Sequence, residues 1–337
     1  MHSKVVIIIL NWNGWKDTIE CLESLYQIGY SNYAIILVDN GSEDESIEKI
    51  KLYCSGELSV ESKFFKYDSS NKPIKVIEYT REEAESCGGN EKKIAGLPSK
   101  RKLILIKNEK NYGFAEGNNI GIRYALKALN PDYVLLLNND TVVDPEFLSN
   151  MVKVAELDKT IGVLGPKICY YDVNGQNNVI ACIGGKIDWK KYAYHIGENL
   201  KDSAENSVGV NECDWVSGTC LMLNIKEVPI KFLNNEFFFG CEDVDLCIRL
   251  KEFDYKCVTV LSSKIWHKGG QSRKKRYTNN IFVMMADIKT NYKFLKTHSK
   301  KYVLYFPLQV IHLFFHVIKK YIIKINNNIF NFYRKRS

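Results

Sequence analysis

The chain has 337 residues, of which 45% are hydrophobic and 26% charged, a composition typical of a folded globular protein and unlike that of a disordered one. Its formal net charge of +8 is uneven, because residues 268–337 hold 16 lysines and arginines against one acid, Asp287, while residues 1–267 carry a net charge of −7. An acidic body with a basic C-terminal part is expected to meet an anionic partner such as phospholipid, pyrophosphate or nucleic acid.

The cysteines and the N-terminus indicate the compartment. None of the ten cysteines forms a C-x-x-C pair, and several, such as Cys21 and Cys220, lie within apolar stretches. Buried free thiols in a reducing cytoplasm are therefore expected. The apolar run at 1–10 is followed directly by polar residues without a cleavage-site pattern, which predicts a buried strand in place of a signal peptide and a protein that is not exported.

The first half of the chain alternates between two patterns. Runs rich in β-branched residues predict strands at 5–10, 34–38, 103–106 and 133–137, with helical periodicity between them. This alternation predicts an α/β fold with a mostly parallel sheet. Ser42 and Glu45 match the S-x-x-E capping box and predict the start of the helix after the second strand. Residues 54–102 are expected to form an insertion with a hairpin or loop around a strand-like piece at 74–79.

Later segments complete the predicted architecture. Helices are expected from about Ala115 to Leu129 and from Asp144, with Asp144 as the cap and the following proline in the first turn. Beyond Ile161 the pattern changes to shorter strands, glycine pairs and aromatic residues, and this half is expected to bind the second substrate.

The expected organisation has three parts: a nucleotide-binding half at 1–150, an acceptor-binding half at 151–272 and a basic, apolar extension at 273–337. Within the extension, the mostly apolar segment 302–318 has only 17 residues, so a helix lying on a membrane surface is favoured over one that spans it.

Polar residues follow three of the predicted strands, at 11–14, 39–42 and 138–141. In parallel sheets, ligands bind where the carboxyl ends of the strands meet. Asp39 could accept the N3–H of uracil or thymine, although a capped turn explains the same motif equally well. Asp140 at a strand end suits a divalent cation that takes its other ligands from water and a pyrophosphate, although Asn and Asp are also common in ordinary turns.

An acidic cluster occurs near residue 240, and a basic one near residue 270. Glu242, Asp243 and Asp245 open a predicted helix, where the helix dipole alone would favour acids. Crowding of like charges also raises a carboxyl pKa, which makes a general base plausible. His267, beside a glycine pair and the basic run 273–276, could bind a metal, although a single histidine is more often structural.

The glycine-containing segment 113–119 has the wrong spacing for the dinucleotide fingerprint, and no Walker lysine follows it. Oxidoreductase and NTPase functions are therefore disfavoured.

The order of these motifs resembles that of the family 2 glycosyltransferases of GT-A fold, particularly their rhamnosyltransferase-like branch, over residues 4–272 with 54–102 as the main interruption. The resemblance implies that Asp39 binds a pyrimidine base and that the segment of Asn11 and Asn13 lines the same pocket. The D-x-D metal motif of the family falls on residues 138–140, where its first Asp is an Asn. Asp140 is then the implied ligand of Mg or Mn, and His267 completes the metal site.

The same resemblance assigns the remaining roles. The acidic pair of the family falls on Glu242 and Asp243, which implies that Asp243 is the general base and Glu242 supports it. Residues 214–218 resemble the stretch between donor sugar and acceptor, so Trp215 is expected to stack on a sugar. The residues expected to bind the nucleotide sugar are Asn11, Asn13, Asp39, Asn40, Gly113, Asn118, Asn138, Asn139, Trp215 and Gly218.

The implied reaction is a single in-line displacement that inverts the anomeric configuration. It would move one sugar from dTDP-rhamnose or a UDP-sugar to a hydroxyl of a glycan or lipid-linked acceptor. The Q-x-x-R-W motif of processive synthases is missing, since Gln271 is followed by Ser-Arg-Lys-Lys, so one sugar per encounter is expected. The C-terminal extension is expected to hold the protein at the inner, cytoplasmic face of the cell membrane.

Two other functions remain open. One is a noncatalytic carbohydrate-binding or scaffold protein that keeps the fold, prompted by Asn138 in place of an acid. The other is a basic nucleic-acid-binding protein, prompted by the run 273–276, although we expect no nucleic-acid partner.

Overall fold

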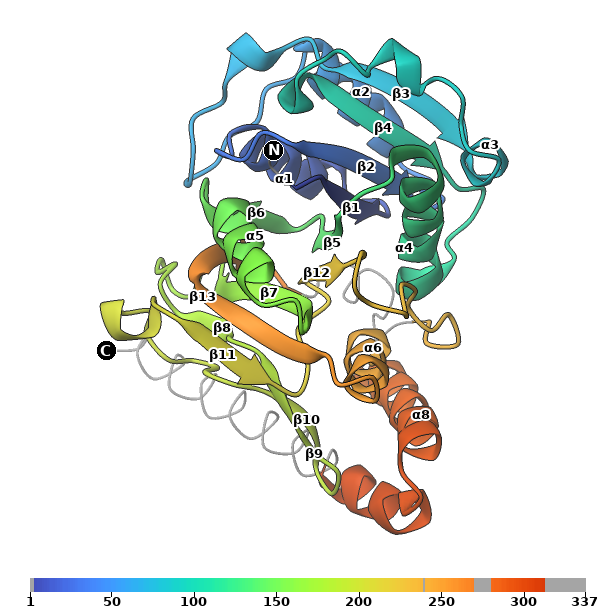
Figure 1. Cartoon of the computed structure of the whole chain (residues 1–337), viewed down its shortest axis with the longest axis vertical. Coiled ribbons are helices and arrows are strands. Elements are labelled where there is room, and N and C mark those ends of the chain that lie inside the picture. The colour runs from blue at the N-terminus through green and yellow to red at the C-terminus, as the bar shows by residue number, and fades with distance from the viewer. Residues whose placement is uncertain (1–2, 239, 270–279, 313–337) are drawn as a thin grey trace, which may run out of the picture. The chain divides into compact units, whose positions relative to one another are not determined.

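The computed structural model describes residues 3–238, 240–269 and 280–312 (Figure 1). The chain forms two compact units, one of residues 1–186 and 195–278 and one of residues 187–194 and 279–337.

A mixed 11-stranded sheet runs through the first unit. Its strands are β1 (Val5–Asn11), β2 (Tyr33–Asp39), β3 (Lys75–Thr80), β4 (Lys102–Lys107), β5 (Tyr133–Asn138), β6 (Thr141–Val143), β7 (Ile161–Tyr170), β8 (Ile180–Cys182), β11 (Val210–Cys213), β12 (Cys220–Asn224) and β13 (Lys256–His267). Its helices are α1 (Trp15–Tyr26), α2 (Ser46–Ser55), α3 (Arg81–Glu85), α4 (Gly113–Tyr124), α5 (Phe147–Leu157) and α6 (Glu242–Lys251).

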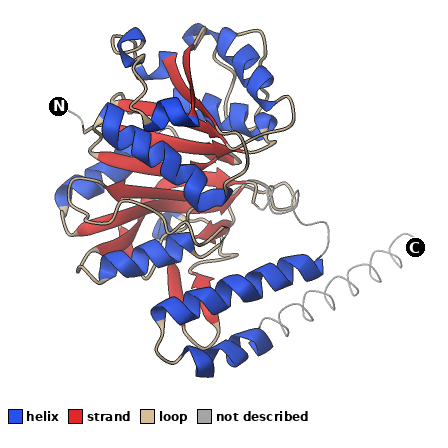
Figure 2. Cartoon of the chain, turned by 90° about the vertical axis from the view of Figure 1, so that its right-hand side faces the viewer, coloured by secondary structure: helices blue, strands red, loops and turns tan. Residues whose placement is uncertain are grey.

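The half of the sheet built from β3, β4, β2, β1 and β5, in that order, is parallel throughout. The strands predicted at 5–10, 34–38, 103–106 and 133–137 are confirmed, each with one or two added residues. These strands are nearly continuous apolar runs because both faces of a parallel sheet are covered. In Figure 2, helices lie on both sides of the strands.

Alternate residues of β1 face different helices, as the pleat of a strand requires. Ile7 and Ile9 belong to a core cluster that includes Leu22 of α1 and Phe147 of α5. Ile8 faces the other way, toward α4, where Gly121 allows close contact: a Cβ at Gly121 would lie 2.8 Å from Ile8 Cγ2. The central strand is therefore enclosed on both faces.

Strand β12 joins the two halves of the sheet. It pairs antiparallel with β5 on one side and with β7 on the other, so that Met222 lies opposite both Leu135 and Leu164. Beyond it, β7 and β13 run parallel to each other. These two strands have 10 and 12 residues, so the prediction of shorter strands beyond Ile161 is wrong for this pair. Both are long and contain many buried residues.

Of the hairpin or loop predicted for the segment 54–102, the structure shows loops and short helices around one strand, β3, and no hairpin. Strand β3 instead pairs in parallel with β4 and forms one edge of the sheet. An ion pair fixes the segment to α1, with Lys72 Nζ 2.9 Å from Glu23 Oε2 and side chains only 4% and 0% exposed.

The predicted start positions of the helices agree less well with the structure than the predicted strands do. Helix α2 begins at Ser46 with Glu45 as N-cap and no side-chain cap, so the capping box is wrong; the Ser42 hydroxyl is bound elsewhere. The helix predicted at 115–129 is confirmed as α4 followed by a π-helical turn at 125–129. Helix α5 begins at Phe147, and Asp144 Oδ1 accepts the N–H of Glu146 just before it.

The ten cysteines all lie in the described residues, are free thiols, and except for Cys87 are buried. This confirms the prediction of buried thiols without disulfides.

The second unit contains α8 (Asn280–His298) and a helical segment at 302–312. Two short strands, β9 (Gly185–Asp188) and β10 (Tyr192–His195), pair with each other, and the turn between them brings Trp189 onto Phe294 at a ring distance of 6.0 Å. Among the described residues, no helix has both the length and the apolar character needed to cross a bilayer. The predicted basic run 273–276 and positions 313–318 of the predicted surface helix lie outside the described residues.

Candidate active site

The carboxyl ends of β1, β2 and β5 lie next to one another at one edge of the sheet. In the strand register, Asn11 lies opposite Asp39, and Leu10 lies opposite Asn138. The three predicted polar motifs therefore meet at one rim, which is the usual ligand site of such sheets.

Asp39 is held in place by its neighbours. Its Oδ1 accepts hydrogen bonds from Asn11 Nδ2 at 2.7 Å and from Ser42 Oγ at 2.6 Å, and its Oδ2 accepts one from the Ser42 N–H at 3.0 Å. The residue is only 1% exposed. Because a carboxylate oxygen can accept two hydrogen bonds, Oδ2 keeps the capacity to accept a further one.

The Ser42 hydroxyl also accepts the N–H of Asn13 at 2.9 Å and so connects the loops after β1 and β2. The Oδ1 of Asn13 accepts the N–H of Glu43 at 2.8 Å. Sequence reasoning missed this role, because the S-x-x-E spacing indicated a helix cap. The signal that could have found it is a hydroxyl placed three residues after an acid at a strand end.

Asn40 and the start of α4 form the wall behind this rim. Asn40 Nδ2 donates to Gly113 O at 3.1 Å, and its Oδ1 accepts from Asn108 Nδ2 at 3.0 Å. Gly113 has φ +82°, and a Cβ there would lie 2.7 Å from Phe238 O. Asn118 Nδ2 donates to Phe114 O within α4 at 2.9 Å. The side-chain N–H groups of Asn40 and Asn118 thus bond the main chain, and nucleotide contacts from them stay a prediction.

Asn138 and Asn139 link the rim to two other parts of the fold. Asn139 Nδ2 donates to Thr18 Oγ1 at 2.9 Å, and Thr18 in turn donates to Asn11 Oδ1 at 2.8 Å. The Asn138 N–H donates to Thr219 O at 2.9 Å, so the end of β5 is tied to the loop that precedes β12.

Asp140 and His267 come together because β6 pairs with the end of β13. His267 lies opposite Thr141 in that pair, and its Nε2 is 3.0 Å from Asp140 Oδ1. The approach lacks the alignment of a hydrogen bond, and the buried Nε2 has no hydrogen-bond partner in the described part of the chain. Burial raises the pKa of Asp140, but the neighbouring His267 and Lys268 lower it more, so the pKa lies below its usual range.

Lys268 fixes the end of β13 on α1. Its Nζ lies 2.6 Å from Asp17 Oδ1 and 2.5 Å from Glu20 Oε2, and its N–H donates to Asp140 O at 3.0 Å. No sequence motif marks Asp17 or Glu20, the two acids of α1 that contact Lys268. They hold the strand end on which His267 lies.

Asp140 and His267 can serve as part of a metal site. No three described side chains of His, Cys, Asp or Glu converge as a complete set of ligands. A cation held by Asp140 and His267 would need further ligands from water and diphosphate, as Mg²⁺ sites at substrate phosphates often do. A buried ring nitrogen that has no hydrogen-bond partner among the described residues and lies 3.0 Å from a carboxylate with a lowered pKa fits such a site.

Glu242 is buried and Asp243 is half-buried at the N-terminus of α6. Asp243 Oδ2 accepts the N–H of Gly218 at 2.7 Å, whereas Glu242 Oε2 is buried without a hydrogen-bond partner among the described residues. Burial and the neighbouring Asp243 raise the pKa of Glu242 to about 8, and burial raises the pKa of Asp243. With a pKa of about 8, Glu242 is mostly protonated at neutral pH, beside an aspartate whose own pKa is also raised.

The acid pair adjoins the rim through the loop before β12. Gly218, which binds Asp243, directly precedes Thr219, which binds the end of β5. The structure thus links Asp243, Asn138 and Asp140 through two hydrogen bonds and consecutive residues of the chain.

Trp215 lies in a different setting from the one predicted. It is 4% exposed, and a Cβ at Gly185 would lie 2.0 Å from the indole. His195 contacts the indole edge to face at 5.1 Å, and the ring N–H donates to Lys186 O. Stacking on a sugar stays a prediction, and it would require this covered ring to become accessible.

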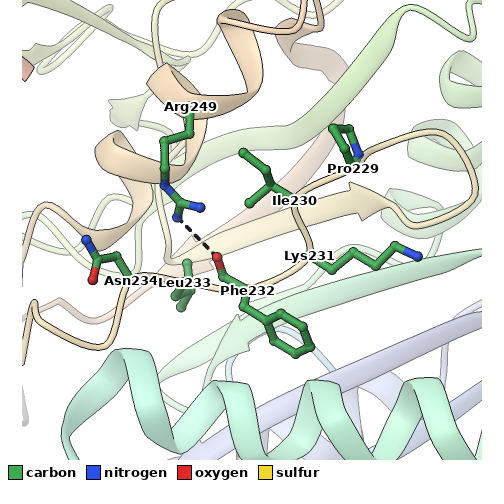
Figure 3. A pocket seen from close by; sticks show the side chains of 7 residues that line it. All are labelled: Pro229, Ile230, Lys231, Phe232, Leu233, Asn234 and Arg249. Carbon is green, nitrogen blue, oxygen red and sulfur yellow. Dashed lines mark hydrogen bonds between the residues drawn. The ribbon is translucent and has the colours of Figure 1, made fainter.

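A pocket of about 480 Å³ lies beside α6 and is lined by Pro229, Ile230, Lys231, Phe232, Leu233, Asn234 and Arg249 (Figure 3). Arg249 is already engaged, since its Nε donates to Asp245 Oδ2 at 2.7 Å and its Nη2 donates to Phe232 O at 3.1 Å. None of the predicted site residues lines this pocket.

Two curated proteins are similar to part of the chain. The low-salt glycan biosynthesis hexosyltransferase Agl10 of Haloferax volcanii is 26% identical over 145 residues, which are 42% of this chain and 44% of Agl10. The rhamnosyltransferase WbbL of Escherichia coli strain K12 is 24% identical over 146 residues, which are 41% of this chain and 54% of WbbL. The chain thus matches about half the length of these relatives.

Two solved structures resemble the fold. Mannosyltransferase PcManGT from Pyrobaculum calidifontis, in complex with GDP-Man and Mn²⁺, aligns with a TM-score of 0.53 and 12% identity over 93% of this chain and 73% of its own. GalNAc-T7 with UDP, GalNAc and Mn²⁺ aligns with a TM-score of 0.54 and 16% identity over 79% of this chain and 44% of its own. At such identities the likeness concerns the fold, a mixed α/β sheet with flanking helices of GT-A type.

The sequence model of the family described as glycosyl transferase family 2 matches residues 6–84 and 89–213. This match covers more than half of the chain, and it contains the β1, β2 and β5 motifs that meet at the rim. The chain therefore belongs to glycosyl transferase family 2.

Proposed function

We propose that the chain transfers one sugar from a nucleotide-diphosphate sugar to an acceptor hydroxyl, with inversion at the anomeric carbon. One observation carries the proposal: the buried Glu242 and the half-buried Asp243 adjoin the strand ends that hold Asn138 and Asp140 through the Gly218–Thr219 loop. Such an arrangement suits a proton acceptor placed next to a bound donor.

Asp243 is the proposed general base. The Gly218 N–H fixes its Oδ2, and its raised pKa brings its basicity closer to neutral pH than that of an exposed aspartate. Glu242 holds a proton more readily, so it can keep the pair singly charged while Asp243 accepts the proton of the acceptor hydroxyl.

Asp140 and His267 are the proposed ligands of a divalent cation, Mg²⁺ or Mn²⁺. When bound, the cation would neutralise charge on the leaving diphosphate. Asp140 is suited to the role because it stays ionised, and His267 because its buried Nε2 lacks another partner among the described residues. The Mn²⁺ bound in the two similar solved structures supports a divalent metal.

Asp39 is the proposed contact to the base of the donor. The remaining acceptor capacity of its Oδ2 matches the N3–H of uracil or thymine, so we favour a UDP-sugar or dTDP-rhamnose. The names hexosyltransferase and rhamnosyltransferase of the two curated relatives agree with a six-carbon sugar as cargo. A hydroxyl of a glycan or of a lipid-linked glycan is the proposed acceptor.

The test is turnover across a panel of UDP-, dTDP- and GDP-sugars with Mn²⁺ or Mg²⁺. One donor should be used, only with metal, and Asp243→Asn should lower kcat by about a hundredfold to ten-thousandfold, the usual contribution of a general base. Asp140→Ala should raise the metal concentration needed for half-maximal rate. Asp254→Asn, an exposed acid shortly after α6, is the matched control and should keep the wild-type rate.

The opposite outcomes identify the alternatives. A protein that binds no donor, and is unaffected by EDTA and by both substitutions, would be a scaffold or carbohydrate-binding protein. Salt-sensitive binding to a polynucleotide that survives Asp140→Ala would favour the nucleic-acid-binding alternative.

A further inference from the structure

The helical segment 302–312 presents an apolar face to solvent. Val303 and Leu304 are 71% and 63% exposed, and Leu308 and Ile311 are 41% and 52% exposed. With the exposed Pro307, these residues follow the spacing i, i+1, i+4, i+5, i+8, which places them on one side of a helix.

The opposite side of the same helix is packed within its own unit. Tyr302 and Phe306 contact the ring of Tyr292 of α8 at 6.1 and 5.0 Å, and Gln309 donates to the main-chain oxygen of Trp189 at 3.1 Å. The helix is therefore seated on its polar and aromatic side, and the aliphatic side is the one left open. This is the reverse of the usual orientation, in which aliphatic side chains face the core.

The chain around this helix is rich in positive charge. Exposed lysines lie on α8 at Lys289 and Lys296 and at the start of the helix at Lys300 and Lys301. Residues 288–337 contain eleven lysines and arginines and not one Asp or Glu. An aliphatic helix face within a segment rich in cations and poor in acids matches the boundary between the acyl chains and the headgroups of an anionic bilayer.

We propose that helix 302–312 lies in the headgroup region of an anionic lipid membrane, with Val303, Leu304, Leu308 and Ile311 turned toward the acyl chains. A second copy of the chain is a poorer occupant, because pairing two such faces would bring two strongly basic segments together. A nucleic acid is also poorer, because phosphates bind cations and make no use of an aliphatic face. The proposal does not depend on the transferase activity.

The experiment is sedimentation of the full chain with vesicles of phosphatidylcholine alone or mixed with phosphatidylglycerol. Wild type should bind the anionic vesicles, and less so at high salt. Leu304→Glu should weaken binding by at least about tenfold, since it removes a buried leucine from the bilayer boundary. The matched control is Leu157→Glu, at the end of α5, where a leucine that is also exposed (79%) lies outside the proposed surface; it should bind as wild type does.

The lysines supply a second, independent measure. Replacing Lys300 and Lys301 with Gln should weaken binding to anionic vesicles by about fivefold per residue and leave binding to phosphatidylcholine unchanged. This variant leaves the aliphatic face intact, so it separates the two contributions.

Several outcomes would overturn the proposal. Equal vesicle binding by wild type and Leu304→Glu would exclude the face as the contact. Loss of a dimer in Leu304→Glu, without lipid binding by wild type, would assign the face to a second copy. A lowered melting temperature in that variant, again without lipid binding, would assign it to residues 313–337. Oligonucleotide binding lost with the lysines but kept in Leu304→Glu would assign the basic surface to nucleic acid.

Discussion

The Ser42 hydroxyl donates to Asp39 and accepts the Asn13 N–H, so one side chain joins the ends of two strands. Ser42→Ala should lower the free energy of unfolding by about 1–3 kcal/mol, because it removes the hydrogen bonds that Ser42 makes with Asp39 and with the Asn13 N–H. Denaturant unfolding measures this loss. Ser55→Ala removes an exposed hydroxyl whose contacts, Leu52 O and Glu57 Oε1, lie close in the chain, and it should change stability by less than about 0.5 kcal/mol. Equal losses in the two variants would contradict the role given to Ser42.

Glu242 makes stability depend on pH in a direction opposite to that of most acids. Its folded-state pKa, about 8, lies above the ordinary value of 4.5, so the folded protein binds the proton more tightly than the unfolded chain. The free energy of unfolding should therefore fall as pH rises from about 4.5 through 8. Melting temperatures of wild type and Glu242→Gln across this range test it.

Glu242→Gln cannot ionise, so its melting temperature should rise relative to that of wild type as the pH increases. Glu212→Gln, an exposed glutamate on β11, should show no such trend. A constant difference between wild type and Glu242→Gln from pH 5 to 8 would mean that the carboxyl titrates outside this range.

At the scale of elements, the turn after β2 depends on Gly41. Its φ is +71°, and a Cβ there would lie 2.5 Å from Cα and C of Lys110, which are main-chain atoms that cannot rotate away. Gly175 has a similar φ of +84°, with open space around the Cβ position. Gly175→Ala should cost about 1–2 kcal/mol from backbone strain alone, and Gly41→Ala distinctly more. Unfolding curves that superimpose would show that the close approach at Gly41 relaxes freely.

The segment 54–102 is anchored by the buried ion pair of Lys72 and Glu23. Lys72→Ala leaves Glu23 buried without its partner and should cost about 3–5 kcal/mol. The exposed pair of Lys63 and Asp172 offers a matched control, since Lys63→Ala should cost at most about 1 kcal/mol. A small loss in Lys72→Ala would indicate that water reaches Glu23 once the lysine is removed.

The sequence predicts the elements of this fold better than their contacts. The apolar runs of β1, β2, β4 and β5 are visible because a strand buried on both faces needs them. The parallel pairing of β3 was missed, since the partner of an edge strand is not encoded in its own pattern. The Ser42 capping box failed because the Ser42 oxygen accepts the Asn13 N–H in place of a main-chain N–H of the helix, while its hydroxyl donates to the Asp39 carboxylate.

The candidate site shows the same division. Asp39, Asp140, Asp243 and His267 could be found because each stands at the end of a strand or the start of a helix. Glu20 and Asp17, which hold Lys268, could not, because their role depends on how α1 lies against β13. A covered position such as that of Trp215 is also invisible in a sequence, where an aromatic residue near a site suggests stacking.

For the whole molecule, the proposed metal site predicts coupled binding. With two protein ligands, Mn²⁺ alone should raise the melting temperature little, whereas Mn²⁺ with UDP should stabilise the fold by about 2.7 kcal/mol at a ligand concentration one hundred times Kd. Differential scanning fluorimetry with each ligand and with both tests this. Asp140→Asn should lose the joint effect and Asp172→Asn should keep it; a large shift with Mn²⁺ alone would contradict a site completed by the diphosphate.

Strand β12 fills the gap between β5 and β7, and it is made long after β5. While a ribosome synthesises the chain, the parallel strands β1 to β5 can assemble, but the outer edge of β5 stays bare until residues 220–224 emerge. Such an edge can pair with a neighbouring nascent chain. Overproduction should therefore favour aggregates seeded by the N-terminal half, and slower translation between β5 and β12 would prolong that exposure without changing the finished protein.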